Sequence, residues 1–102
     1  MSRILVQGTG GSVRVSEAAL TEIVRRAVAS VEGARLRKGR RRLGVELQDG
    51  RASADLQLAV AYGRVLPEVS AAVQERVADA LARMCDVEVD AVHVTVEELE
   101  RA

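Results

Sequence analysis

A strand pattern turns into a helix pattern within residues 52–70, ASADLQLAVAYGRVLPEVS, and this junction constrains the fold more than any other part of the chain. Leu56, Leu58 and Val60 recur at every second position, which is the alternation of a half-buried strand. Gly63 then permits a turn, and Pro67 suits the first turn of a helix because its φ is preset and its nitrogen carries no hydrogen. The stretch predicts a strand followed directly by a helix over about 67–84.

Other periodicities predict one more helix and two more strands. Ser16 is a natural N-cap before an apolar series of helical spacing, and Gly33 is a natural residue after its end, so a helix is expected over about 17–32. Apolar and other residues alternate over residues 43–48, which predicts a strand. Asp49-Gly50, which follows it, predicts a type I′ hairpin with the strand of residues 52–61. Residues 92–96 alternate as a last strand, with a bulge expected near Asp90.

These one-sided elements predict an α+β two-layer sandwich with two helices on one face of a three- to four-stranded sheet. The order is (β)-α-β-β-α-β, in which the first strand would be short, over residues 13–15. The last strand should run parallel to the strand of residues 52–61. The sequence does not decide whether it lies beside that strand or beside the strand of residues 43–48. We expect a flexible N-terminal segment over 1–11, one domain over 12–97 and a short C-terminal tail over 98–102.

Composition narrows the function. The chain of 102 residues suits a single core, and Tyr62 is its one aromatic residue, which disfavours proteins that stack bases on aromatic rings. A single cysteine, Cys85, excludes an intrachain disulfide and fits a reducing compartment. No apolar run approaches the ~20 residues of a membrane span, and the first residues lack the apolar middle of a signal peptide. We therefore expect a cytoplasmic protein.

Little in the sequence suggests catalysis. His93 is expected on the open side of the sheet and Cys85 at the end of a helix, and the two lack companions at metal-ligand spacing. Gly8 to Ser12 resemble a phosphate loop only superficially, because Gly11 is followed by Ser12 where a P-loop needs lysine. We expect no enzyme activity, no cofactor and no metal.

Charge is unevenly distributed although the net charge is zero. Residues 34–51 hold seven basic against two acidic residues, a net of +5, and residues 86–102 hold one basic against six acidic residues, a net of −5. The positive pole contains a basic cluster that could contact a protein, an anionic lipid surface or nucleic acid, or be neutralised by the acidic end. Its members are Arg35, Arg37, Lys38, Arg40, Arg41 and Arg42. Such poles can attract within one chain or, in salt-sensitive fashion, between chains.

A second candidate surface is the side of the sheet away from the helices. Alternation places small and weakly charged residues there, which suits docking of a partner or of a second copy. The expected members are Ser53, Asp55, Gln57, Ala59, Ala61, His93 and Thr95.

An ordered series of short motifs resembles the alkaline shock protein family, also called envelope stress response proteins, of Gram-positive-type bacteria. The series covers roughly residues 11–97. It consists of Gly11-Ser12-Val13-Arg14-Val15-Ser16, Val31-Glu32-Gly33, Gly44-Val45-Glu46-Leu47 before Asp49-Gly50, Tyr62-Gly63, Pro67-Glu68-Val69 with Val73-Gln74, and Val92-His93-Val94-Thr95-Val96. The resemblance implies proteins without known enzymatic activity that self-assemble and are recruited to the membrane by a small anchored partner.

Together these observations favour a non-catalytic scaffold or assembly protein of the bacterial cell envelope stress response. Its expected partners are itself, as a homo-oligomer, and a membrane-anchored protein, with an anionic lipid surface as a further candidate. It would be cytoplasmic, or peripheral at the inner face of the cell membrane when an anchored partner recruits it. The alternative is a nucleic-acid-binding module that uses the basic loop 35–42, against which the lack of aromatics and the zero net charge count.

Overall fold

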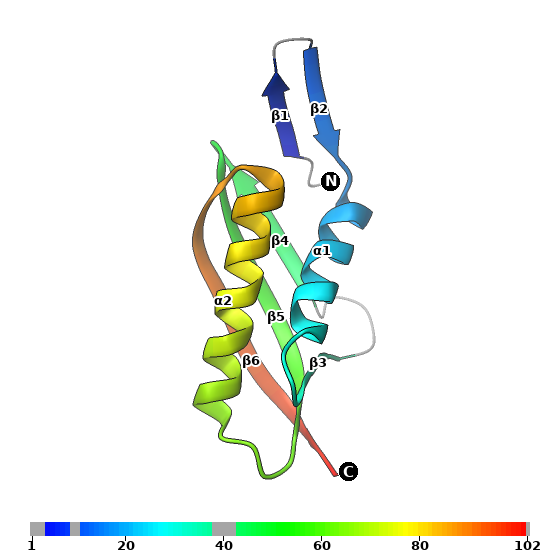
Figure 1. Ribbon diagram of the computed structural model, residues 1–102, viewed down its shortest axis with the longest axis vertical. Coiled ribbons are helices and arrows are strands. Elements are labelled where there is room, and N and C mark those ends of the chain that lie inside the picture. Colours follow the sequence, from blue (N-terminus) through cyan, green and yellow to red (C-terminus); the bar gives the residue numbers. More distant parts are fainter. Residues whose placement is uncertain (1–3, 9–10, 38–42, 102) are drawn as a thin grey trace.

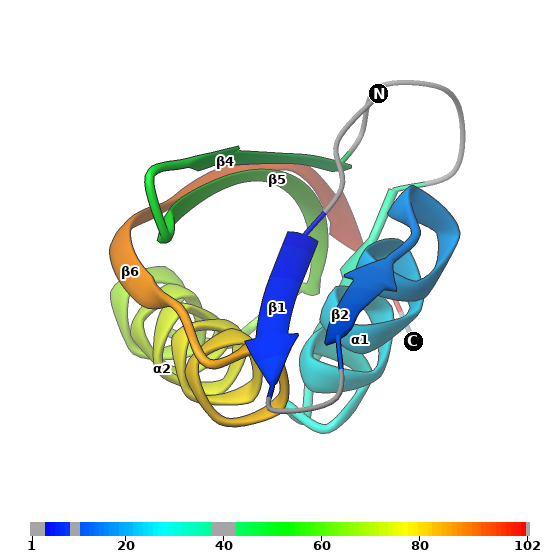
Figure 2. The same ribbon diagram turned by 90° about the horizontal axis from the view of Figure 1, so that it is seen from above.

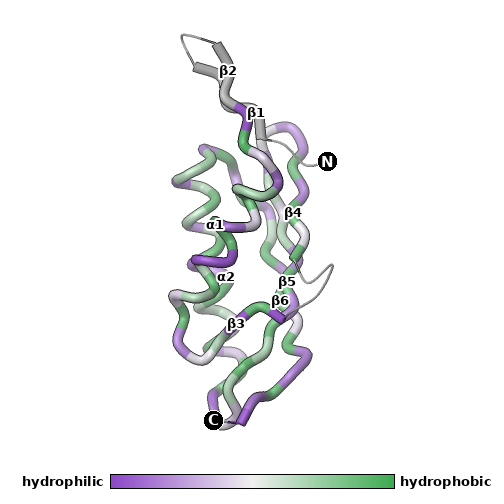
Figure 3. The backbone as a smooth tube through the Cα atoms, turned by 90° about the vertical axis from the view of Figure 1, so that its right-hand side faces the viewer, coloured by the Kyte–Doolittle hydropathy of each residue, from purple (hydrophilic) through white to green (hydrophobic). Residues whose placement is uncertain are grey.

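The computed structural model describes residues 4–8, 11–37 and 43–101. They form the expected α+β architecture, in which two helices cover one face of a four-stranded sheet (Figure 1). Seen from above (Figure 2) and edge-on (Figure 3), the helices and the sheet make two separate layers. In chain order the elements are β1 Ile4–Gly8, β2 Gly11–Val15, α1 Glu17–Ala29, β3 Ala34–Leu36, β4 Leu43–Gln48, β5 Arg51–Ala61, α2 Leu66–Cys85 and β6 Glu88–Glu100.

The long strand β5 organises the sheet. β6 pairs with it in parallel along its whole length, which confirms the predicted direction and answers the open question of its neighbour. β4 pairs antiparallel with residues 51–56 of β5 and β3 with residues 58–60. Because β6 occupies one edge of β5, β3 and β4 lie one after the other along its other edge. Residue Asp90 is skipped in the register between β5 and β6, so the predicted bulge is confirmed.

The two junctions around β5 follow the sequence signals. Asp49 and Gly50 both have positive φ, at 53° and 74°, as the predicted type I′ turn requires. Gly63 has a φ of 99° between β5 and α2, and Pro67 stands in the first turn of α2. At its other end α2 is closed by Asp86 in the left-handed conformation, whose N–H donates to the Ala82 carbonyl oxygen at 3.1 Å.

Helix α1 begins as predicted and ends earlier than predicted. The Ser16 hydroxyl oxygen accepts a hydrogen bond from the Ala19 N–H at 3.1 Å, which confirms the N-cap. The helix ends at Ala29 rather than near residue 32. Ser30 caps it, since its hydroxyl donates to the Ala27 carbonyl oxygen at 2.7 Å. Gly33 does have a positive φ of 87°, but it serves the turn before β3.

The core lies between the two layers and contains only apolar side chains among the described residues. Alternate residues of β5 pack against the apolar stripes of both helices. The core contains no aromatic side chain among the described residues, so the two layers pack through leucine, valine and alanine side chains. Its largest fully buried members are Leu20, Val24, Val28, Leu56, Leu58, Val60, Val73, Val77, Leu81 and Cys85.

Three segments differ from the sequence-based expectation. β1 lies within the segment 1–11 that was expected to be flexible, and it pairs with β2 from Ile4 opposite Val15 to Gly8 opposite Gly11. This hairpin stands at one end of the molecule, beyond the helices and the sheet (Figure 1). β3 forms within the stretch expected to be a loop or a hairpin arm. β6 continues to Glu100, past the expected last strand, because Tyr62 N–H donates to the Glu100 carbonyl oxygen at 2.7 Å.

Candidate interaction surfaces

The two charge poles of the sequence meet within the chain, on the sheet face away from the helices. Arg35 of β3 forms a two-pronged pair with Glu100, in which Nε lies 2.7 Å from Oε1. Arg37 contacts Glu97 at 2.9 Å and Glu98 at 3.3 Å. At the other end of the sheet Arg51 contacts Glu88 and Asp90. Three arginines of the positive pole thus pair with five carboxylates of the negative pole.

These ion pairs shift the protonation of their members. The hydrogen bond from Arg51 holds the pKa of the Asp90 carboxyl below its usual value, and Asp90 in turn raises the pKa of Arg51. The hydrogen bond to Glu100 raises the pKa of Arg35 in the same way. The groups are solvent-exposed, so each pair adds little stability by itself and acts mainly to hold β3 and β6 against β5.

Only part of the predicted basic cluster can be placed. Arg35 and Arg37 lie on the sheet and are already paired with carboxylates of β6. Lys38, Arg40, Arg41 and Arg42 lie outside the described residues. The neutralisation within the chain, one of the two possibilities that the sequence left open, therefore applies to Arg35, Arg37 and Arg51.

The predicted open sheet face is assembled largely as alternation indicates. Asp55 lies opposite His93, and Gln57 lies opposite Thr95, with Asp55, His93 and Thr95 exposed. Ala61, opposite Glu100, is half-buried, as is Ser53. Part of this face is a shallow hollow of about 350 Å³ that Gly44 helps to form, since no atom lies within 4 Å of where its Cβ would be.

Ala59 corrects that surface. It was expected to be open but is only 1% exposed. Its register partners are Arg35 on one side and Glu98 on the other, and both belong to the ion pairs described above. A small residue between long paired side chains is covered by them, so Ala59 belongs to the interior.

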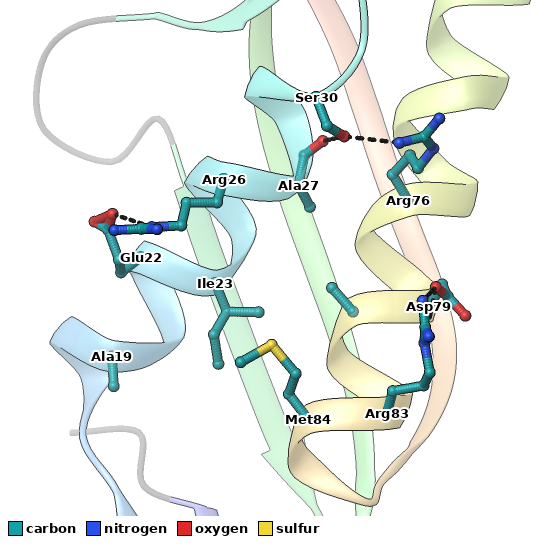
Figure 4. Close-up of a pocket in the computed structure, with 11 residues that line it drawn as sticks. Ala19, Glu22, Ile23, Arg26, Ala27, Ser30, Arg76, Asp79, Arg83 and Met84 are labelled. Carbon is teal, nitrogen blue, oxygen red and sulfur yellow. Dashed lines mark hydrogen bonds and ion pairs between the residues drawn. The ribbon is translucent and has the colours of Figure 1, made fainter.

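The helical layer carries a groove that the sequence did not predict. It has a volume of about 770 Å³ and runs between α1 and α2 on the outer side of the helices (Figure 4). Ile23 and Met84 lie within it, and Met84 is 68% exposed. Both residues continue the apolar stripes of their helices. Such a stripe predicts burial in general, but it does not show that Ile23 is only partly buried and Met84 exposed. The remaining lining residues are Ala19, Glu22, Arg26, Ala27, Ser30, Arg76, Asp79, Ala80 and Arg83.

Charged side chains form the rims of this groove. On α1, Arg26 Nε lies 3.0 Å from Glu22, and on α2, Arg83 Nη2 lies 2.6 Å from Asp79. Arg76 differs from these, because its Nη1 donates to the Ser30 hydroxyl at 3.1 Å and it has no carboxylate partner among the described residues (Figure 4). The groove therefore combines an apolar floor with one uncompensated positive charge.

A second apolar surface lies where β5 passes into α2. Tyr62, Val65 and Leu66 are exposed there, and Leu99 of β6 is exposed beside them, opposite Val60. We call these four residues the β5–α2 tip. It lies at the opposite end of the molecule from the β1–β2 hairpin (Figure 1). Tyr62, the one aromatic residue, is 68% exposed and takes no part in the core.

The chemistry of the remaining candidates is limited. Cys85 is buried, and burial raises the pKa of its thiol, which makes it a poor nucleophile. Across residues 4–8, 11–37 and 43–101, no group of three or more metal-ligating side chains gathers. Within the same residues, no helix has the length and apolar character needed to cross a membrane.

Comparison with known proteins identifies a family. The family model of the alkaline shock proteins, described as having a cell envelope-related function, matches residues 34–101. No curated protein matches the chain. Among solved structures it is similar to the MamM C-terminal domain, at 19% identity and a TM-score of 0.54 over 81% of this chain and 99% of that one. A zinc form of a substituted MamM domain gives 20% identity and a TM-score of 0.55, over 81% and 86% of the two chains. At such identities the MamM likeness shows the fold alone.

Proposed function

Because this chain belongs to the alkaline shock protein family, whose function is related to the cell envelope, we propose that it is a non-catalytic scaffold of the envelope stress response that acts by self-association. Family membership supports the envelope role. The scaffold role is an inference from the surfaces of the molecule, which offer contacts to proteins rather than a site for chemistry.

The groove between α1 and α2 is the observation that carries the proposal. Most apolar side chains of the two helices are buried against the sheet, yet Ile23 and Met84 remain at the surface between charged rims. Apolar surface in water is unfavourable by about 25 cal/mol per Å², and a protein partner that covers it removes this cost. An apolar floor with a polar rim is the usual anatomy of a protein–protein contact.

The ion pairs of the sheet face support the same proposal against nucleic-acid binding. Arg35, Arg37 and Arg51 would be the natural phosphate contacts on that face, but carboxylates of β6 already neutralise them. Phosphate binding needs free cations, because release of counterions supplies most of its free energy. A gel shift at several salt concentrations separates the two readings, and we expect no retained complex with DNA or RNA.

We also propose that the protein is held at the cell membrane. An anchored partner would hold the assembled protein at the inner face of the membrane, as the family resemblance implies. Such recruitment predicts that a fluorescent fusion lies at the cell periphery and becomes diffuse when the anchored partner is deleted.

Light scattering after size-exclusion chromatography tests self-association. Weak to moderate contacts have dissociation constants between about 1 µM and about 1 mM, so the protein should be loaded across that range. We expect the mean mass to rise with concentration above that of the 10.9 kDa monomer. A mass of one chain at every concentration would contradict the proposal.

A further inference from the structure

The exposed large apolar side chains that the structure describes fall into two places. Of the five among the described residues, four make up the β5–α2 tip and the fifth, Met84, lies in the helix groove. Met84 and Leu66 stand at opposite ends of α2, which at 1.5 Å per residue places them about 27 Å apart. The tip of one copy therefore cannot cover the Met84 end of its own groove.

The two surfaces also differ in shape. The tip consists of the turn after β5, the first residue of α2 and Leu99 near the end of β6, at the lower end of the molecule in Figure 1. The groove is a hollow between two helices, with Ile23 and Met84 pointing toward each other across it (Figure 4). A protruding apolar turn and an apolar hollow are complementary, whereas two tips or two grooves are not.

Charge adds to this complementarity. Arg76 at the groove lacks a carboxylate partner, and Glu68, two residues after Leu66 at the tip, lacks a cationic partner among the described residues. A contact between tip and groove would bring one unpaired anion toward one unpaired cation. Such pairing fixes the register of a contact more than it strengthens it.

We propose that the β5–α2 tip of one copy docks in the groove between α1 and α2 of a second copy, an inference that rests on the proposed self-association. Because the two surfaces are different, the contact is heterologous and each bound copy still offers one free tip or groove. Copies would therefore add head to tail, with one tip seated in one groove at each contact.

Two single variants and their mixture test this arrangement. Met84→Glu places a charge in the groove and leaves the tip intact, and Tyr62→Glu does the reverse. Both positions are 68% exposed, so neither change should disturb folding, which circular dichroism checks. Each variant alone should be monomeric at concentrations where the native protein is oligomeric. An equimolar mixture should form dimers and nothing larger, because one intact tip meets one intact groove.

The controls separate this inference from the proposed function. Thr95→Glu alters an exposed residue on the sheet face and should leave the oligomers unchanged. If the native protein associates but Met84→Glu or Tyr62→Glu keeps the native mass, or if their mixture stays monomeric, the tip-to-groove contact is wrong and self-association stands. A native protein that is monomeric throughout overturns the proposed function itself.

Charge reversal gives a second readout. Glu68→Arg and Arg76→Glu should each weaken association several-fold, and the chain that carries both should recover most of it. An unaffected mass in both single variants, or no recovery in the double variant, would place Glu68 and Arg76 outside the contact. Because apolar surface dominates, association of the native protein should persist at about 0.5 M NaCl, where exposed charges are screened within a few Å.

Discussion

Arg51 holds Asp90 at the point where β6 leaves the register of β5. Nη2 of Arg51 lies 2.6 Å from Oδ1 of Asp90, and Asp90 is the residue that β6 skips between the partners of Ala52 and Ser53. A bulged residue loses its place in the ladder of backbone hydrogen bonds. Here a side chain from the neighbouring strand holds it, so the start of a long parallel pair is fixed although its register is broken.

Asp90→Asn should therefore lower stability in a pH-dependent way. The folded-state pKa of Asp90 lies below its ordinary value of 3.8, so the pair stabilises the fold above that value and the stabilisation is lost as pH falls through the folded pKa. The melting temperature of Asp90→Asn should be lower than that of the native protein near pH 7. The difference should shrink as the pH falls below 3.8 and should be gone once the pH lies below the folded-state pKa of Asp90, where the carboxyl is protonated in both states.

Arg51→Gln is the matched control for this pair. The double variant should lose less than the sum of the two single losses, because both changes remove one interaction. A melting difference between Asp90→Asn and the native protein that stays constant from neutral to acid would contradict the assignment.

Leu58→Ala tests the phase of the central strand. Leu58 is fully buried between the helices and the sheet, so its truncation should lower the free energy of unfolding by about 2–5 kcal/mol. Its neighbour Gln57 points to the other face, and Gln57→Ala should cost about 1 kcal/mol or less. Urea denaturation measures both, and equal losses would show that the two faces are not distinguished as described.

Ala59→Lys should unfold the domain rather than merely change its surface. Ala59 lies beneath the side chains that join β3 to β6, where a lysine has no room and no carboxylate that is free of its own arginine. Burying an unpaired charge is strongly unfavourable, and we expect a loss of several kcal/mol in the free energy of unfolding. Ala71→Lys on the exposed side of α2 is the control and should change it by under about 0.5 kcal/mol. A native melting temperature for Ala59→Lys would disprove the burial.

Comparing Gly63→Ala with Gly44→Ala separates the effect of backbone strain on stability from the effect of the space available for a Cβ. Neither glycine has an atom within 4 Å of where a Cβ would lie, but Gly63 has a φ of 99° and Gly44 has no positive φ. Gly63→Ala should cost about 1–2 kcal/mol because an L residue rarely adopts that conformation. Gly44→Ala should be neutral or stabilise by up to about 1 kcal/mol, because it restricts the unfolded chain. Thermal melts of the pair check this, and equal effects would contradict it.

Short-range chemistry explains which parts of the fold could be predicted. The Ser16 cap, the Asp49-Gly50 turn, the glycine before α2 and the bulge at Asp90 each depend on a few adjacent residues. The alternation of β5 showed which of its faces is buried for the same reason, and the helix between β5 and β6 predicted that the two strands run parallel. β1 was missed because its apolar residues precede a glycine-rich stretch of sequence that resembles a flexible tether. β3 was missed because a strand of three residues with Arg35 at its centre is too short to show a period, and it pairs only where β5 extends beyond β4.

The candidate surfaces depend on contacts that sequence does not specify. Alternation places Ala59 on the open face, but only the fold brings Arg35 and Glu98 alongside to cover it. Ile23 and Met84 fit the apolar stripes of their helices, yet Ile23 is only partly buried against the core and Met84 is exposed. Whether an apolar helix position is core or surface depends on the width of the opposite layer, which no local pattern encodes.

β3 and β4 share one edge of β5, and this arrangement determines how freely the segment between them can vary in length. The chain leaves the sheet after Leu36, which lies opposite Leu58, and returns at Leu43, which lies opposite Leu56. The two anchor points are thus two residues apart on one strand, about 7 Å, and pairing fixes both. The cost of closing a longer segment between fixed ends grows only logarithmically with its length. A peptide, tag or whole domain with neighbouring termini could therefore be grafted between Arg37 and Leu43, so that every strand keeps its partner and Arg37 keeps its hydrogen bond to Gln57.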